Sequence, residues 1–182
     1  MDLPTLRTPR LLLKPLNAPQ AARLAELADD PWVRAFTANM PSPYTVEAAH
    51  AFIERSRQAA ERDEDYVAGI HTHAGELMGV INLRPSRRHR SGHLGYWIGA
   101  AFRNQGFTTE AVRHLMLFAF QTLELHRVHT ACLAANSASA RVLEKAGLAP
   151  EGRSRQAFLQ DGVFHDLLLF GAVAATWPPP AP

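Results

Sequence analysis

Residues 95–124 constrain the fold of this chain more than any other stretch. An apolar, aromatic run has the composition of a strand that ends at Gly99, a polar loop follows, and a helical pattern then begins. The apolar side chains that recur at helical spacing, and so should face the core, are Ala111, Leu115, Phe118 and Leu123. This succession predicts a strand–loop–helix unit around which the other elements are arranged.

The loop of this unit reads Arg103-Asn104-Gln105-Gly106, and it leads into a helix N-terminus that could bind an anion. First-turn N–H groups lack intrahelical partners, Gly106 permits a close backbone approach, and Arg103 adds a charged donor. Thr108 or Thr109 is the expected N-cap, and Glu110 suits the positive end of the helix dipole. The stretch matches neither G-x-G-x-x-G nor the P-loop, and an ordinary strand-to-helix connection is the alternative.

The rest of the chain alternates between helical and strand patterns. The expected elements, in order, are a strand at 10–16, a helix at 18–28, a short helix or ordered loop at 32–36, a helix at 45–61, a hairpin of strands 66–72 and 77–83, a strand at 93–99, the helix described above, a strand at 127–134, a helix at 139–146 and a hairpin of strands 152–159 and 163–173. This order predicts one α/β domain over residues 1–176. The proline-rich residues 177–182 cannot join a ladder and should form a tail.

Composition excludes several classes of protein. The chain has 182 residues, 47% of them hydrophobic and 20% charged, which is enough for one domain with a core and argues against disorder. The formal charge of +2 gives no reason to expect nucleic-acid binding, and the basic cluster at 84–90 is either a solvated turn or a contact for an acidic ligand. The single cysteine, Cys132, rules out a disulfide framework and a thiolate metal site, and it should be buried.

The N-terminal sequence has no signal-peptide pattern, and no apolar run approaches the ~18–20 residues of a membrane span. We therefore expect a cytoplasmic protein without a membrane partner.

Two motifs together resemble the GNAT superfamily of acetyl-CoA-dependent N-acetyltransferases. Residues 103–108, R-N-Q-G-F-T, are similar to the superfamily's pyrophosphate loop, and residues 136–148, N-S-A-S-A-R-V-L-E-K-A-G-L, are similar to a signature of its RimJ/RimL-type branch. The resemblance covers about residues 7–170. It implies a mixed, mostly antiparallel sheet of about seven strands, with a central parallel pair that separates to admit acetyl-CoA, flanked by about four helices.

The resemblance also implies which residues bind acetyl-CoA. Backbone N–H groups near the start of the helix would hold the two phosphates, with Arg103 as charged support, and the pantetheine would pair with the strand edge and with Asn136. Thr108 departs from the usual Gly or Ala, so it either crowds the phosphates or offers them its hydroxyl. The implied cofactor-binding residues are Trp97, Ile98, Gly99, Arg103, Asn104, Gln105, Gly106, Phe107, Thr108, Asn136 and Ser139.

Acetyl transfer to an amine needs a base, an oxyanion donor and a proton donor for the leaving thiolate. His93 stands where this branch often has Glu, so it is either the base, directly or through water, or a tolerated substitution. The position of the usual tyrosine acid is Leu143, and Ser139 is the alternative acid unless it only packs or caps its helix. The oxyanion donor is expected at a backbone N–H around Ile98–Gly99, and Tyr96 and Trp97 must point to opposite faces of their strand.

The resemblance implies a primary amine as acceptor, either a protein N-terminus such as that of a ribosomal protein or a small molecule. A non-catalytic acyl-CoA-binding module is the competing class, and a homodimer is expected only by family resemblance. Candidates for the acceptor wall, each of which could equally belong to the core, are Trp32, Phe36, Tyr44, Phe158 and Phe164.

Overall fold

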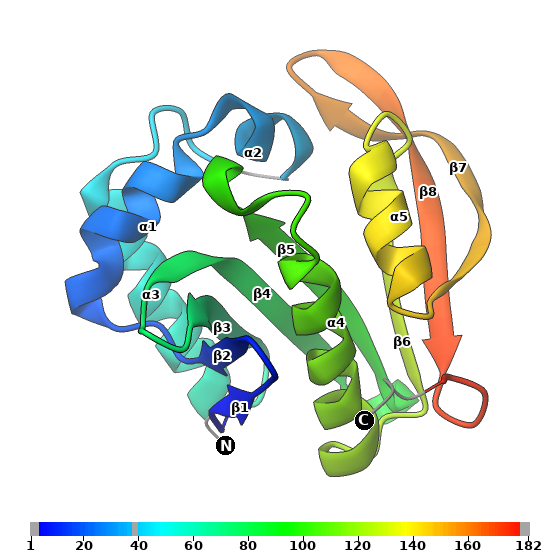
Figure 1. The fold of residues 1–182 in the computed structure, drawn as a ribbon. Coiled ribbons are helices and arrows are strands. Elements are labelled where there is room, and N and C mark those ends of the chain that lie inside the picture. Colours follow the sequence, from blue (N-terminus) through cyan, green and yellow to red (C-terminus); the bar gives the residue numbers. More distant parts are fainter. Residues whose placement is uncertain (1–3, 38–39, 179–182) are drawn as a thin grey trace.

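An eight-stranded sheet runs through the molecule, with helices packed on both of its faces (Figure 1). The computed structural model describes residues 4–37 and 40–178. The strand order is β1-β2-β3-β4-β5-β6-β8-β7. All neighbouring strands are antiparallel except β5 and β6, which form a parallel pair at the centre. The predicted mixed, mostly antiparallel sheet with one parallel pair is confirmed.

The strands are β1 (Leu6–Arg7), β2 (Leu11–Lys14), β3 (Tyr66–Thr72), β4 (Leu77–Ser86), β5 (Ser91–Ile98), β6 (Arg127–Leu133), β7 (Ala149–Gln160) and β8 (Val163–Val173). The helices are α1 (Ala21–Ala28), α2 (Pro31–Phe36), α3 (Val46–Glu61), α4 (Phe107–Leu117) and α5 (Ser137–Lys145). Short 3₁₀ turns occupy Ala18–Gln20, Arg87–His89 and Ala100–Phe102, and a π-helical turn at Phe118–Thr122 continues α4.

The strand count exceeds the expected seven because β1 adds a two-residue strand at the edge. The uncertain segment at 32–36 is a helix, since the Asp30 side chain accepts hydrogen bonds from the N–H groups of Trp32 and Val33 and caps it. The expected N-cap of the central helix is wrong. Gly106, with φ of 80°, is the N-cap of α4, so Thr108 lies inside the first turn.

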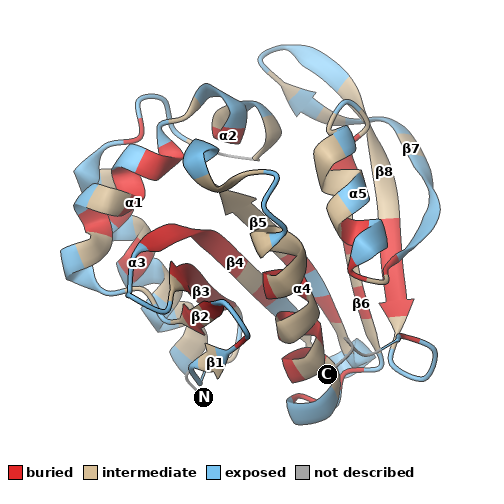
Figure 2. Ribbon diagram, in the orientation of Figure 1, coloured by how far each residue is buried: buried red, intermediate tan, exposed pale blue. Residues whose placement is uncertain are grey.

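The core has two parts, one on each face of the sheet. The larger part lies under α4 and α5 and contains the predicted core residues of the central helix, Ala111, Leu115, Phe118 and Leu123. The smaller part lies under α1 and α3. Figure 2 shows buried residues concentrated in β2, β3 and β4, whereas the far end of the β7–β8 hairpin is exposed.

Trp177 is part of this core, which corrects the expectation that it begins a tail. Its side chain is 8% exposed, its ring packs on Phe120 at 5.4 Å between centroids, and its Nε1 donates to the Ala146 carbonyl oxygen at 2.9 Å. The chain therefore returns to the sheet after β8 and covers the end of α5. The predicted tail residues 179–182 lie outside the described residues.

The basic cluster at 84–90 is tied into the fold. Arg84 pairs with Asp65 at 3.1 Å, Arg87 donates to the Tyr66 hydroxyl at 3.2 Å, and Arg90 donates to the Glu124 carbonyl oxygen at 2.8 Å. Within the described ranges, no helix combines the length and the apolar character needed to cross a membrane.

Candidate active site

A groove opens where the central parallel strands separate. Backbone pairing between β5 and β6 ends at His93 and His129, although β5 continues to Ile98 and β6 to Leu133. At the point of divergence, the Thr130 hydroxyl donates to the Leu94 carbonyl oxygen at 2.7 Å and so bridges the two strands. The groove has a volume of ≈ 1140 Å³ and is lined by both strands, by α2 and α3, by the first turn of α4 and by one side of α5 along its length.

One end of the groove is the N-terminus of α4. Asn104 and Gly106 both have positive φ, 61° and 80°, which turns the chain sharply before the helix. Asn104, Gly106, Phe107 and Thr108 line the groove. The exposed Gln105 does not, because its side chain donates to the Ala101 carbonyl oxygen at 2.8 Å. The unpaired N–H groups of the first helical turn are therefore available to an anion here.

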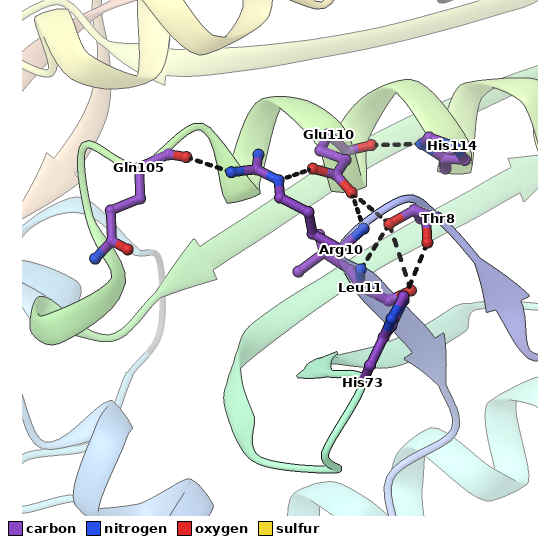
Figure 3. Close-up of polar contacts among 7 residues, drawn as sticks. All are labelled: Thr8, Arg10, Leu11, His73, Gln105, Glu110 and His114. Carbon is purple, nitrogen blue, oxygen red and sulfur yellow. Dashed lines mark hydrogen bonds and ion pairs between the residues drawn. The ribbon is translucent and has the colours of Figure 1, made fainter. Parts of the chain in front are cut away.

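This loop is held from behind by Arg10, as Figure 3 shows. Arg10 Nη1 donates to the Gln105 carbonyl oxygen at 3.0 Å, its Nε donates to Glu110 at 2.6 Å, and its guanidinium lies 4.7 Å from the centre of the Phe107 ring. Thr8 adds a hydrogen bond of 2.5 Å to Glu110. Glu110 was expected only to complement the helix dipole, and its role in joining the turn between β1 and β2 to α4 was missed.

Burial by itself would raise the pKa of Glu110, but the hydrogen bonds from Thr8 and Arg10 outweigh burial, so the pKa is lowered. Glu110 is therefore ionised at neutral pH and keeps Arg10 beside the loop.

Arg103, the expected charged support for phosphate, is engaged elsewhere in this structure. Its Nη2 donates to Asp30 Oδ1 at 2.9 Å, and its guanidinium lies 5.8 Å from the centre of the Trp32 ring. Burial would raise the pKa of Asp30, but Arg103 and the backbone N–H groups of Val33 and Trp32 lower it overall. Arg103 thus connects the phosphate end of the groove to α2, and it still lines the groove.

Tyr96 and Trp97 point to opposite faces of β5, as strand geometry requires, and the structure assigns the faces. Tyr96 packs in the core under α4 and α5, whereas Trp97 packs with the residues under α1 and α3. Both line the groove together with Ile98. The sequence alone left this assignment open.

A small polar cluster lies on the α5 side. Tyr96 Oη and Ser139 Oγ share a hydrogen bond of 2.8 Å, and Tyr96 Oη also donates to the Ser139 carbonyl oxygen at 3.3 Å. Asn136 Oδ1 accepts from the Ser139 N–H at 3.0 Å, so Asn136 is the N-cap of α5. Burial raises the pKa of Tyr96, so its hydroxyl keeps its proton. Tyr96 was missed as a site residue.

His93 lies at the groove on the opposite face from Leu94 and Tyr96, in register with Arg84 and with His129. Its ring meets that of His129 edge to face, 5.4 Å between centroids. Its side chain is exposed on one side, yet desolvation by the groove walls lowers its pKa. The charges of His129 and Arg84 lower this pKa further, and the carboxylate of Asp65 offsets part of the change. The neutral imidazole therefore dominates at pH 7.

The expected oxyanion donors are only half available. The Gly99 N–H donates to the Met78 carbonyl oxygen at 2.8 Å, so it already serves the β4–β5 ladder. The Gly99 N–H is therefore not a free oxyanion donor, which leaves the Ile98 N–H as the candidate. Across residues 4–37 and 40–178, no three His, Cys, Asp or Glu side chains gather in a group that could hold a metal ion.

The acceptor-wall candidates fall into three groups. Tyr44 is largely buried but also lines the groove, Trp32 and Phe36 line it with their rings 4.6 Å apart, and Phe158 and Phe164 lie on the β7–β8 hairpin outside the groove lining. The polar residues Asp65 and Asn82 also line the groove, and Asn82 Nδ2 donates to Asp65 at 2.8 Å. The sequence analysis did not single out these two, because a strand start and a mid-strand amide carry no distinctive signal.

Sequence comparison identifies a family that covers most of the chain. The family described as "Acetyltransferase (GNAT) domain" matches residues 10–149. That range spans the Arg10–Glu110 contact, the loop before α4 and all of α5.

Individual proteins agree with this match. The Bacillus subtilis (strain 168) protein named "Probable N-acetyltransferase YjcK" is 36% identical over 126 residues, which are 68% of this chain and 70% of the relative. YdaF of the same organism, provisionally named a ribosomal N-acetyltransferase, is 31% identical over 172 residues, 92% of this chain and 93% of the relative. A crystal structure described as a probable acetyltransferase superposes with a TM-score of 0.87 at 28% identity, covering 95% of this chain and 98% of that one.

Proposed function

The chain belongs to the acetyltransferase (GNAT) family, and from that premise we propose that it transfers an acetyl group from acetyl-CoA to the α-amine of a protein N-terminus, of the kind found in ribosomal proteins. Acetyl-CoA is the cosubstrate of the family. The provisional name of YdaF, which matches nearly the whole chain, supports the ribosomal acceptor. We propose the cytoplasm as the place of this reaction, and a homodimer as the form that the family resemblance implies.

The observation that carries this proposal is the separation of β5 from β6 beyond His93. A strand edge that loses its ladder partner can accept an extended, amide-containing chain in place of a strand. The pantetheine arm is such a chain, and it would lie against Tyr96, Trp97 and Ile98. Its phosphates would then reach the N-terminus of α4, where Gly106 leaves room for them.

When bound, acetyl-CoA supplies a thioester whose carbonyl carbon takes the amine nitrogen and whose sulfur departs as the C–S bond breaks. His93 accepts the proton that the amine gives up, directly or through one water, because its lowered pKa keeps it neutral at pH 7. The Ile98 N–H would donate a hydrogen bond to the developing oxyanion. Ser139 donates a proton to the sulfur, with Tyr96 hydrogen-bonded to the serine oxygen at 2.8 Å.

The two faces of the sheet divide these roles. Ser139 and Tyr96 belong to the α5 side, whereas Trp97 packs on the side of α1 and α3 and His93 shares its strand face. The amine would therefore arrive from the α1–α3 side and the thiol would depart toward α5. At the gap between β5 and β6, groups from both faces of the sheet could reach one carbonyl carbon.

An extended acceptor fits the rim on the α1–α3 side. Trp32 is 47% exposed beside Phe36, and the nearby β7–β8 hairpin contacts α2 through Gln160, whose Nε2 donates to the Arg34 carbonyl oxygen at 3.0 Å. Phe164 on that hairpin is 60% exposed. Exposed aromatic groups at and near a groove are typical of surfaces that bind a polypeptide, and here Trp32 and Phe36 line the groove while Phe164 lies beyond its lining.

The test combines acetyl-CoA calorimetry with thiol release against three acceptors: peptides with a free N-terminus, the same peptides with a blocked N-terminus and internal lysine, and small amines. We expect acetyl-CoA to bind and only the free N-terminal peptides to turn over. Turnover of small amines alone would replace the proposed acceptor. Binding without turnover of any acceptor would favour the non-catalytic module, and absence of binding would overturn the proposal.

A further inference from the structure

A half-buried amide lies in the floor of the groove, on the same face of the sheet as His93. Asn82 is in the middle of β4 and pairs with Gly95 of β5. Two residues farther along β4, Arg84 pairs with His93. Paired residues, and residues two apart on one strand, share a face of the sheet, so Asn82 and His93 are diagonal neighbours. Asn82, Gly95 and His93 all line the groove.

The orientation of the Asn82 amide is fixed by a carboxylate beside it. Asn82 Nδ2 donates to Asp65 Oδ1 at 2.8 Å and to Asp65 Oδ2 at 3.1 Å, and Arg84 Nη2 donates to the same carboxylate at 3.1 Å. A carboxylate paired with arginine accepts hydrogen bonds and does not donate them, so the NH₂ end of the amide must face Asp65. Across residues 4–37 and 40–178, no donor reaches Asn82 Oδ1.

Gly95 leaves space in front of this oxygen. A Cβ atom at position 95 would lie 2.5 Å from Asn82 Oδ1 and 4.0 Å from its Nδ2, so the oxygen is the end of the amide that faces Gly95. In the described part of the chain no buried side-chain oxygen lacks a hydrogen bond, so the unpaired Asn82 Oδ1 is open to the groove. Along β5 this space lies between Trp97 and His93.

We propose that Asn82 Oδ1 accepts a hydrogen bond from the attacking amine and so directs its lone pair at the thioester carbon, with Asp65 as a positioning residue that fixes the amide. The inference rests on the proposed function, because it takes His93 to be the base. A neutral primary amine has two N–H groups and one lone pair. Its nitrogen forms the bond to the carbonyl carbon, gives one proton to His93 and keeps the other on Asn82, while the thiolate leaves with a proton from Ser139.

This arrangement makes the enzyme selective for primary amines. A neutral secondary amine has a single N–H, and that proton must go to the base. Its second carbon substituent would then occupy the space at Gly95 and contact Asn82 Oδ1, so the amine gains no hydrogen bond from the amide. A peptide whose first residue is N-methylated should therefore react more slowly than the same peptide with a primary amine.

The test measures kcat/KM for the fastest primary-amine acceptor of the panel above and for its N-methylated form. The proteins are the wild type, Asn82→Leu, Asp65→Ala, the double variant of these two and the control Gln20→Leu. Leucine is close in shape to asparagine and removes both polar atoms. Gln20 is also a half-buried amide, with its Nε2 2.6 Å from His71 Nε2, but it does not line the groove.

Asn82→Leu should lower kcat/KM for the primary amine about 5- to 100-fold and that for the N-methylated amine much less, so the ratio of the two falls. Asp65→Ala should lower the same ratio, and should lower it no further when added to Asn82→Leu. Because each ratio is taken within one protein, changes in stability or in the basicity of His93 cancel. Gln20→Leu should lower Tm and keep the wild-type ratio, and acetyl-CoA affinity in calorimetry should be the same in all variants.

A wild-type ratio that persists in Asn82→Leu, or equal reaction of the two amines with the wild type, would overturn the inference while leaving acetyl transfer intact. If Asn82→Leu did not fold, an unchanged ratio in Asp65→Ala would overturn it equally. If the wild type acetylated no amine, the proposed function would fail together with this inference.

Discussion

Replacing Tyr96 by phenylalanine removes a single oxygen from the wall of the groove. That oxygen shares a hydrogen bond of 2.8 Å with Ser139 Oγ and donates to the Ser139 carbonyl oxygen at 3.3 Å. The aromatic ring stays, so the packing under α5 and the shape of the groove are retained. The variant therefore separates the hydroxyl's part in proton transfer from its part in packing.

The expected size follows from the change in charge at Ser139. Before reaction the Tyr96–Ser139 bond joins two neutral groups and contributes about 0.5–1.5 kcal/mol, whereas a bond to an oxygen that is losing its proton contributes about 1.5–3 kcal/mol. The transition state thus gains about 1–2 kcal/mol more than the ground state from this hydroxyl. Tyr96→Phe should lower kcat about 5- to 30-fold.

The KM for acetyl-CoA should change little, because the ring that lines the groove remains. Stability should fall by about 1–2 kcal/mol, since Ser139 Oγ loses its partner, which corresponds to a decrease in Tm of about 2–8 °C. Burial raises the pKa of Tyr96, so the rate difference between wild type and variant should not vary with pH from 6 to 9.

Tyr66→Phe is the matched control. The Tyr66 hydroxyl also makes partly buried polar contacts, to Asp63 at 3.0 Å and to Arg87 at 3.2 Å, but Tyr66 does not line the groove. This variant should lose stability without losing kcat.

Steady-state thiol release gives kcat and KM, and thermal unfolding gives Tm. If Ser139 is the proton donor and Tyr96 acts through it, then Tyr96→Phe added to Ser139→Ala should slow the enzyme no further. A Tyr96→Phe enzyme with wild-type kcat, or full additivity of the two substitutions, would refute the reasoning.

Three further predictions concern other parts of the molecule. Gly106→Glu should abolish acetyl-CoA binding in calorimetry, because it places a carboxylate at the anion site. The control Gly106→Asn should still bind, because asparagine tolerates the φ of 80° and adds no charge. Equal affinities of the two variants would remove this loop from the cofactor site. In the wild type, kcat/KM should rise with pH as the His93 imidazole loses its proton, at a pH below the ordinary histidine pKa of about 6.5. His93→Ala should eliminate this rise. An unchanged pH profile would exclude His93 as the base. Trp177→Ala should destabilise the fold by about 3–5 kcal/mol in urea unfolding, because a buried indole is lost, and a value near zero would contradict its place in the core.

Local patterns in the sequence were sufficient to predict most elements of the fold. Periodicity of 3.6 and of 2 residues, with glycine and proline at the boundaries, placed α3, α4 and the strands of the β3–β4–β5 meander close to their observed bounds. The N-cap of α4 was misplaced because Gly106 adopts a positive φ, a choice that depends on the turn and not on side-chain preference.

The sequence also determined the family and the two motifs that border the groove, since each motif is a continuous run of residues. It could not determine how these runs meet. The Tyr96–Ser139 hydrogen bond joins residues 43 apart in the chain, the Arg103–Asp30 pair joins residues 73 apart, and the Arg10–Glu110 pair joins residues 100 apart.

Only the tertiary structure decided those contacts, because strand register and helix packing bring distant side chains together and no local preference encodes their pairing. The same holds for the face of β5 to which Tyr96 points and for the burial of Trp177 after β8. Sequence therefore determined which chemical groups the protein possesses, and the fold decided which of them share a hydrogen bond beside the groove.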